Sequence, residues 1–436
     1  MQLLEMAIQT RSIGRTPKSF WPMKEKEVPL SAWILLAVSW LTFLLAYVGR
    51  QSVFSIFPVL QAELGFSNAQ LGLTGSIFLW IYSFGSPAGG MVGDRFQYAS
   101  VAQWSVVVWS LVTLATGFAT SPEAVLGLRA LLGASQSVFV PTALAAIASV
   151  HPGTTRSKAV AIWGTAQLAG IVVGGWYGGF VAERLDWRWV FWLVGGIGVV
   201  YGLGLRPVIR RLLPLDKKSS SEGHSSRLAA NPLILLGTPT FALCSVSFFI
   251  FCAMLWVIYT WLPTFFVEKF ALSLTEAGLT ATLSVQVTTA LGLLLGGFAA
   301  DWLVVRSPAA RVWLLIVGML GAAPSLHLLA IASTFGTTRL AAAVFGLFSG
   351  LYMSNAMASV LDVVLSRRHA TAVGMMNLVG GISGGLAAYL IGQLKAQYGI
   401  ERIMSLVGAT GAIALIVLLV ALFAFFPSDY RRAQEA

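Results

Sequence analysis

Charged residues are scarce in this sequence. They make up only 10% of the 436 residues, whereas hydrophobic residues make up 57% and the mean hydropathy is +0.80. An ordinary globular domain has about 25% charged residues, and a water-exposed surface cannot be built from so few. The composition therefore excludes a soluble enzyme, a nucleic-acid-binding domain and a disordered chain. It predicts a helical protein that crosses a membrane many times.

Cysteine is nearly absent as well, and Cys244 and Cys252 lie in one apolar run. Their spacing on a helix corresponds to about 12 Å, which is too far for a disulfide. The sequence contains no Gly-x-x-x-x-Gly-Lys-Ser/Thr phosphate-binding loop and no His/Cys/carboxylate cluster with metal-ligand spacing. We therefore expect neither an enzyme nor an ATP-driven pump, and neither a metal nor any other cofactor.

Twelve apolar segments follow one another along the chain, each long enough to cross a bilayer as a helix. They lie at 32–60, 68–91, 101–120, 123–149, 157–182, 189–209, 238–267, 276–303, 311–333, 338–365, 370–396 and 402–427. The predicted fold is an all-α polytopic membrane protein with twelve transmembrane helices in two six-helix repeats. The predicted N-terminal tail, first bundle, linker, second bundle and C-terminal tail are 1–30, 31–209, 210–237, 238–427 and 428–436.

The two halves of the chain share short motifs. Gly72 in the second segment matches Gly278 in the eighth, and the glycine pair at 174–175 matches the pair at 384–385. Parallel six-helix repeats place a substrate site between the halves, near the middle of the membrane. Small residues let helices approach closely and slide. Two glycine stripes therefore predict the moving seams between the halves, Gly170, Gly174 and Gly178 in the fifth segment and Gly380, Gly381, Gly384 and Gly385 in the eleventh.

Lysine and arginine are distributed unevenly between the two sides of the predicted bundle. With the N-terminus in the cytoplasm, 20 of the 28 basic residues lie on the cytoplasmic side, six lie on the other side, and two lie inside spans. This bias predicts that both termini are cytoplasmic, in a bacterial-type inner membrane. It also accounts for the net charge of +11 without a nucleic-acid partner.

Arg50 is the sharpest functional signal, because it lies well inside an apolar segment. An ionisable side chain there is costly and usually faces a water-filled cavity or a partner. No carboxylate lies near the middle of any predicted span, so charge balance favours an anionic ligand. A guanidinium binds a carboxylate through two parallel hydrogen bonds. The alternative is an arginine that reaches the membrane surface or pairs structurally.

Several motifs resemble those of a known family. The segment Gly89–Arg95 resembles the loop between spans two and three of the major facilitator superfamily, and Arg129–Gly133 resembles its span-four Arg-x-x-x-Gly motif. Within that superfamily, Tyr47–Gln51 and Tyr259–Pro263 are similar to segments of the anion:cation symporters, which carry sugar acids and other organic anions. The resemblance covers essentially the whole chain. It implies a secondary transporter of a small organic anion that works by alternating access, and we expect a monomer.

The resemblance also implies roles for individual side chains. The candidate substrate-binding residues are Arg50, Tyr47, Tyr82, Gln167, Asn377 and Asn355. The arginine would bind the substrate carboxylate, and the tyrosine one helical turn before it would line the same site. Hydrogen bonding between helices is the alternative role for the other polar members.

A second group of residues concerns coupling and gating. Arg129 matches an arginine tied to conformational change, although a purely structural role stays open. Asp94 and Arg95, with Asp301 at the matching place in the second half, resemble a gate at the cytoplasmic helix ends. Gln136 lies seven residues after the span-four arginine, where proton-coupled members carry a glutamate.

The chain departs from the proton-coupled pattern at a second position too. Gly49 stands immediately before Arg50, where proton-coupled members carry an aspartate. Neither Gly49 nor Gln136 can titrate, and a carboxylate is the usual proton carrier. The resemblance favours proton-coupled symport with these carboxylates replaced. A uniporter, an anion exchanger, or a metabolite or drug exporter of the same fold stays open.

Overall fold

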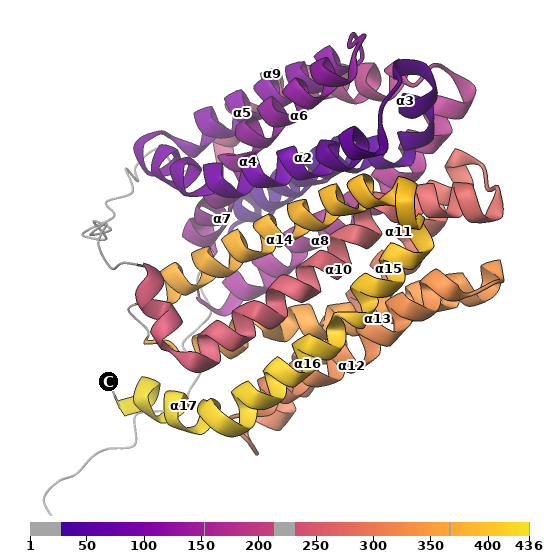
Figure 1. Cartoon of the computed structure of the whole chain (residues 1–436). Helices are drawn as coiled ribbons and strands as arrows, with labels where there is room; N and C mark the ends of the chain where they lie inside the picture. Colours follow the sequence, from indigo (N-terminus) through magenta and orange to yellow (C-terminus); the bar gives the residue numbers. More distant parts are fainter. Residues whose placement is uncertain (1–27, 152, 213–231, 366–367, 436) are drawn as a thin grey trace, which may run out of the picture.

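The computed structural model describes residues 28–151, 153–212, 232–365 and 368–435, and within these ranges the chain is almost entirely helical. The first half comprises α2 (Leu30–Ser55), α3 (Phe57–Leu64), α4 (Asn68–Arg95), α5 (Tyr98–Thr116), α6 (Pro122–Ser137), α7 (Phe139–Val150), α8 (Gly153–Arg184) and α9 (Arg188–Leu212). The second half comprises η1 (Pro232–Gly237), α10 (Pro239–Phe270), α11 (Leu274–Val304), α12 (Ala310–Ile331), α13 (Phe335–Leu361), α14 (His369–Tyr398), α15 (Ile400–Ala409), α16 (Gly411–Val420), η3 (Ala421–Phe425) and α17 (Phe426–Glu435). Figure 1 shows the long helices running side by side.

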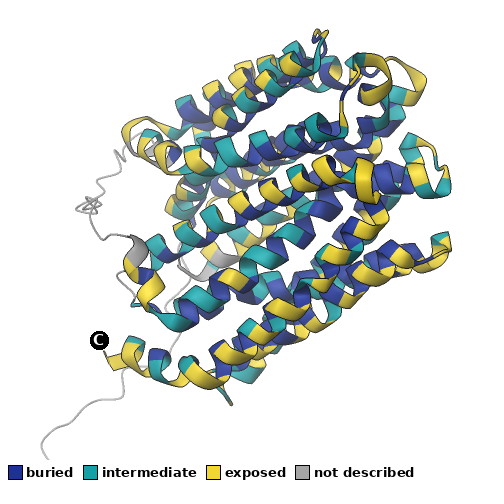
Figure 2. Ribbon diagram, viewed as in Figure 1, coloured by how far each residue is buried: buried dark blue, intermediate teal, exposed yellow. Residues whose placement is uncertain are grey.

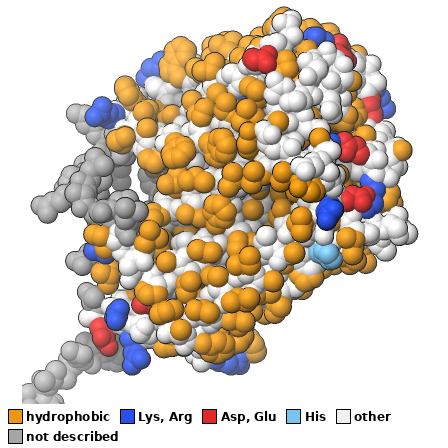
Figure 3. Space-filling view, in the orientation of Figure 1, with side chains coloured by type: hydrophobic (Ala, Val, Ile, Leu, Met, Phe, Trp, Pro, Cys, Tyr) orange, Lys and Arg blue, Asp and Glu red, His pale blue; other side chains and the backbone are white. Residues whose placement is uncertain are grey.

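The helices have the length and composition of membrane spans. Within the described residues, eleven helical segments are long and apolar enough to cross a bilayer. The helix α4 is also long enough at 28 residues, but its Gly, Ser and Asn side chains lower its mean hydropathy. Figure 3 shows apolar side chains over the middle of the bundle and charged side chains towards its two ends. The predicted all-α fold class, with twelve transmembrane helices in two repeats, is confirmed.

Three predicted spans are divided into consecutive helices. The first breaks at Ile56, between α2 and α3, and the fourth breaks at Val138, between α6 and α7. The twelfth breaks at Thr410, between α15 and α16. Pro58 and Pro141 lie just after the breaks at Ile56 and Val138, and a proline ring both lacks a backbone N–H and clashes with the preceding turn. The predicted linker begins within the last turns of α9 and ends with η1, and 213–231 lie outside the described residues. The domain boundaries therefore stay predictions.

Glycines let the two halves touch along two seams. A Cβ atom added to Gly278 in α11 would lie 2.1 Å from the carbonyl oxygen of Gly175 in α8. A Cβ atom added to Gly72 in α4 would lie 2.5 Å from the carbonyl oxygen of Ala388 in α14. Neither position accepts a larger side chain without moving the facing backbone. Neither glycine belongs to the predicted seam stripes.

The two predicted stripes have different outcomes. Gly385 and Gly381 of the predicted α14 stripe do face α4 of the other half. The predicted α8 stripe, Gly170, Gly174 and Gly178, faces α2 of its own half. The seam prediction is therefore confirmed for α14 and wrong for α8.

The repeated glycine pairs make equivalent helix contacts in the two halves. Gly174 faces Val48 of α2, in its own half, while Gly175 faces α11 of the other half. In the second half, Gly384 faces Trp256 of α10, and Gly385 faces Trp80 of α4 across the seam. Each pair therefore joins a central helix of its own half to a helix of the other half. Figure 2 shows buried positions where the helices face one another.

The halves separate towards one end of the bundle. We call this the linker end, because α9 ends and α10 begins there (Figure 1, left). Gly164 lies three helical turns from Gly175 on the same face of α8, yet a Cβ atom added to it would meet nothing within 4 Å. Gly374 likewise lies three helical turns from Gly385 on the same face of α14, and a Cβ atom added to Gly374 would also meet nothing within 4 Å. The halves are thus packed together at the opposite end and apart at the linker end.

The opposite end is also closed by polar contacts between the halves. Glu183, at the end of α8, accepts hydrogen bonds from the backbone nitrogen of Thr275 at 3.1 Å and from the Thr275 hydroxyl. Gln51 of α2 donates to the backbone oxygen of Tyr259 in α10 at 3.0 Å. Carboxylates are stabilised at helix N-termini, so Glu183 adds an electrostatic contact to the glycine seam.

Candidate functional site

Arg50 lies in the middle of the bundle and is 5% exposed. Its guanidinium carbon is 4.4 Å from the ring centre of Tyr47, 4.3 Å from that of Phe78 and 5.0 Å from that of Tyr82. The ring faces of aromatic side chains attract cations, more strongly when water is excluded. Two of the predicted site residues, Tyr47 and Tyr82, therefore meet at the predicted arginine.

The hydrogen-bond partner of Arg50 is uncharged. Its Nη2 donates to Oε1 of Gln136 at 2.8 Å, and its buried Nε has no hydrogen-bond partner. Among the residues that the structure describes, no carboxylate forms an ion pair with Arg50. A buried charge without a counter-charge costs several kcal/mol, and a bound carboxylate would reduce that cost.

Arg129 lies beside this group and is 2% exposed. Its Nε donates to the carbonyl oxygen of Thr74 at 3.2 Å, while its Nη2 is buried without a partner. Its guanidinium carbon is 5.2 Å from the ring centre of Phe78, which Arg50 also contacts. Phe78 is not among the residues predicted for the site, although it lies one helical turn before Tyr82 on the same face of α4.

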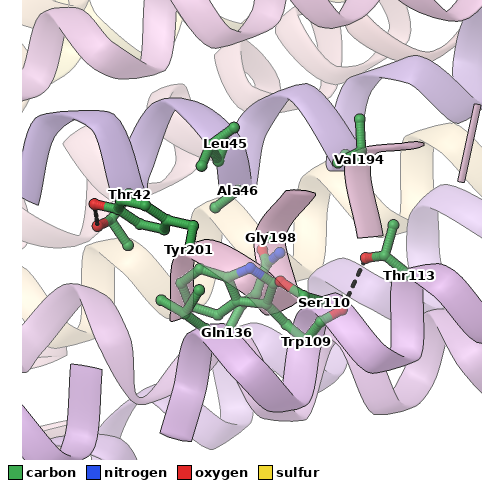
Figure 4. A pocket seen from close by; sticks show the side chains of 12 residues that line it. Thr42, Leu45, Ala46, Trp109, Ser110, Thr113, Gln136, Val194, Gly198 and Tyr201 are labelled. Atoms are coloured by element: carbon green, nitrogen blue, oxygen red, sulfur yellow. Dashed lines mark hydrogen bonds between the residues drawn. The ribbon is translucent and has the colours of Figure 1, made fainter. Parts of the chain in front are cut away.

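A small polar cavity lies next to Gly49 and Gln136, inside the first half (Figure 4). Its volume is about 10 Å³, close to the space that one water molecule needs. The hydroxyl groups of Thr42 and Tyr201, which are hydrogen-bonded at 2.9 Å, line it. A Cβ atom on Gly49 would lie 3.5 Å from Val194, an ordinary contact. The space beside position 49 is therefore polar, and no carboxylate lines it.

The remaining predicted ligands lie elsewhere. Asn355 is buried in α13, and its Nδ2 donates to the carbonyl oxygen of Gly296 in α11 at 3.3 Å, which joins two helices of the second half. Gln167 is half-buried in α8, and Asn377 is exposed in α14, near the linker end. The hydrogen bond of Asn355 thus links α13 to α11. The ligand roles of these three side chains stay predictions.

The predicted gate residues lie at the linker end, where the halves are apart. Arg95, the last residue of α4, and Asp301, in the last turn of α11, are both exposed. The side chain of Asp94 is outside the described residues. The gating role of these residues stays a prediction, since the halves do not meet here.

A helix bundle built from two six-helix repeats is an architecture found in many secondary transporters. The chain belongs to the Major Facilitator Superfamily, whose family profile matches residues 39–388. It is thus a multi-pass membrane transport protein and not an enzyme.

Relatives with assigned names are transporters of anions. The chain is 24% identical over 405 residues to a D-galactonate transporter of Escherichia coli O6:H1, covering 86% of this chain and 92% of the relative. It is 25% identical to a probable galactarate/D-glucarate transporter of Escherichia coli K12, covering 68% and 72%. It is 28% identical to a probable sulfoacetate transporter of Cupriavidus necator, covering 83% and 86%.

Solved structures share the fold. A bacterial homologue of the human lysosomal transporter Spinster, solved in an inward-facing and occupied conformation, superimposes with a TM-score of 0.78 at 19% identity. The match covers 91% of this chain and 97% of that chain. This chain therefore shares its fold with that transporter over most of its length.

Proposed function

We propose that this protein transports a small organic anion by alternating access and that Arg50 binds the carboxylate of the substrate. The observation that carries the proposal is the environment of Arg50. The guanidinium is buried between aromatic rings, and its hydrogen-bond partner is the neutral Gln136. A cation held in this way favours an anionic ligand, because the ligand supplies the missing counter-charge.

The relatives support the same class of substrate. Galactonate, glucarate and sulfoacetate, which give three of them their names, all carry a carboxylate. A drug exporter with cationic substrates is not supported, because Arg50 and Arg129 are the charged side chains buried at the middle of the described bundle.

Gly49 and Gln136 bear on whether transport is coupled to protons. Gly49 and Gln136 do not titrate, and no carboxylate lines the cavity beside them. These two observations favour a second candidate function, uniport or anion exchange, over proton symport by the usual family route. In proteoliposomes loaded with an exchangeable anion and held at zero membrane potential by potassium and valinomycin, uniport or exchange predicts no pH change in the lumen during anion uptake. A stoichiometric pH change would support symport.

We further propose that the protein is a monomer in a bacterial inner membrane with both termini in the cytoplasm. The asymmetric distribution of lysine and arginine supports this orientation. The linker end is then the cytoplasmic end, and the structure is open to the cytoplasm.

Uptake of labelled sugar acids into proteoliposomes tests the substrate proposal. We expect Arg50→Gln to reduce uptake about 100-fold, because a charge-assisted bidentate contact is lost. Arg339→Gln, at an exposed position at the start of α13, is the matched control and should leave uptake unchanged. Normal uptake by folded Arg50→Gln protein would refute the proposed site.

A further inference from the structure

We infer that Gln286, together with Tyr259, recognises an uncharged hydroxyl-bearing end of the substrate and thereby selects hydroxylated monocarboxylates over dicarboxylates. This inference rests on the proposed function, since it takes Arg50 as the ligand of the first carboxylate. It adds the second half of the protein to the site.

Gln286 is buried without satisfied hydrogen bonds. Its side chain in α11 is 2% exposed, and neither its amide nitrogen nor its amide oxygen has a hydrogen-bond partner of good geometry. Buried polar side chains are normally hydrogen-bonded, so an exception requires an explanation. A carboxamide offers both donors and an acceptor, which is the combination that a hydroxyl group uses.

The position of Gln286 explains why packing does not use its amide. Thr282, one turn earlier in α11, packs against Gly175 of α8, and Thr289, one turn later, packs against Gly350 of α13. Gln286 lies between these two contact sites. The Tyr259 hydroxyl of α10 is its polar neighbour, although the two do not form a hydrogen bond of good geometry.

A continuous set of side chains joins Gln286 to Arg50 across the halves. Tyr259 of α10 lies near Tyr47 of α2, and the Arg50 guanidinium lies over the Tyr47 ring at 4.4 Å. Gln51, next to Arg50, donates to the backbone oxygen of Tyr259 at 3.0 Å. Tyr259 and Gln286 lie about 16 and 18 Å from the ends of their helices, so both are deep in the bundle.

The charges in the site determine which substrate fits. Both arginines buried at the centre belong to the first half, whereas the buried polar side chains in the spans of the second half, within the described residues, are uncharged. A second carboxylate near Gln286 would lose its hydration without meeting a cation, which is costly. A hydroxyl group there would instead satisfy the free amide. The second half thus discriminates against a second negative charge.

The test compares three six-carbon acids on the purified full-length protein by isothermal titration calorimetry. The first is galactonate, a hydroxylated monoacid. The second is galactarate, the corresponding diacid, and the third is hexanoate, a monoacid without hydroxyl groups. The variants are Gln286→Leu, which keeps the volume but removes the amide, and Gln286→Lys, which adds a cation. Gln61→Leu, at an exposed position in α3, is the matched control.

We expect the wild type to bind galactonate at least about 10-fold more tightly than galactarate or hexanoate, because buried polar groups penalise ligands that leave them unpaired. Gln286→Leu should lower the galactonate-to-hexanoate ratio about 10-fold while leaving hexanoate affinity unchanged. Gln286→Lys should shift preference towards galactarate, a gain that a purely structural role would not produce.

Three results would overturn the inference: a wild type that prefers galactarate, a wild type that binds none of these acids, or a Gln286→Leu protein with an unchanged ratio. The Arg50→Gln variant separates this inference from the proposed function. If Arg50→Gln abolishes binding but Gln286→Leu leaves the ratio unchanged, only the role of Gln286 is wrong. If Arg50→Gln binds all three acids normally, the proposed function itself fails.

Discussion

The two halves of this protein share one fold but differ in the charge that they bury. In the first half, the guanidinium groups of Arg50 and Arg129 both contact the Phe78 ring. In the second half, the corresponding interior contains neutral polar groups such as Gln286 and Asn355. The repeated glycines make equivalent contacts in both halves and so determine how the helices pack. The side chains that are not repeated determine which charges are buried at the centre.

The largest expected effect concerns the feature that the halves share. Gly175→Leu and Gly385→Leu should each abolish uptake and lower the yield of folded protein, because their side chains would overlap Thr282 and Trp80 across the seams. Gly127→Leu, at an open glycine in α6, is the control. Uptake and size-exclusion profiles measure both effects. Tolerance of either seam substitution would show that the halves need not approach so closely.

The next effect concerns the neutral partner of Arg50. Gln136→Glu would place a carboxylate 2.8 Å from the guanidinium, where it would compete with the substrate. We expect uptake to fall about 10-fold at pH 7.5 and to recover as the pH falls towards 5. Burial disfavours the charged form of this glutamate by more than the neighbouring guanidinium favours it, so the glutamate takes up a proton there and releases Arg50. Adding Gly49→Asp should increase the proton dependence further. Uptake assays between pH 5 and 8 measure this, and an unchanged pH profile would argue against competition at Arg50.

A smaller effect is expected from the ring between the two arginines. Phe78→Ala removes the aromatic face from both guanidinium groups and should weaken substrate affinity about 5- to 10-fold, which corresponds to about 1 kcal/mol for a cation–π contact. Phe118→Ala, at a 65% exposed position, is the control. Isothermal titration calorimetry measures substrate affinity for each protein. Equal affinities of the wild type and Phe78→Ala would mean that the Phe78 ring contributes only to packing.

The smallest effect on binding is expected in the second half at Asn355. Asn355→Leu breaks its hydrogen bond to Gly296 and should lower thermal stability, by about 1–2 kcal/mol, with little change in substrate affinity. Thermal unfolding and substrate titration on the same sample separate the two roles. A drop in affinity of 10-fold or more would instead support the predicted ligand role of Asn355.

The fold was predictable because the signals that define it are local or repeated. Apolar segments of bilayer length predicted the membrane spans, and the matching glycine pairs predicted where helices approach closely. The breaks at Ile56 and Val138 were missed, since hydropathy continues across both positions. Pro58 and Pro141, just beyond the breaks, are the signals that were overlooked.

The site was only partly predictable, because its contacts join distant parts of the chain. Arg50 could be found from its position in an apolar segment. Its bond to Gln136 spans 86 residues and depends on how α2 packs against α6, which composition and spacing do not specify. Polarity alone likewise does not separate Asn355, which bonds a neighbouring helix, from Gln286, which has no bond of good geometry.

The central claim is that Arg50, with only a neutral partner, binds the substrate through its negative charge. The most direct measurement compares galactonate with its uncharged amide on the wild type and on Arg50→Gln by isothermal titration calorimetry. We predict that the wild type binds the acid about 100-fold more tightly than the amide and that Arg50→Gln binds the two alike. Equal binding of both compounds by the wild type, or a preference for the acid that survives in Arg50→Gln, would contradict this account.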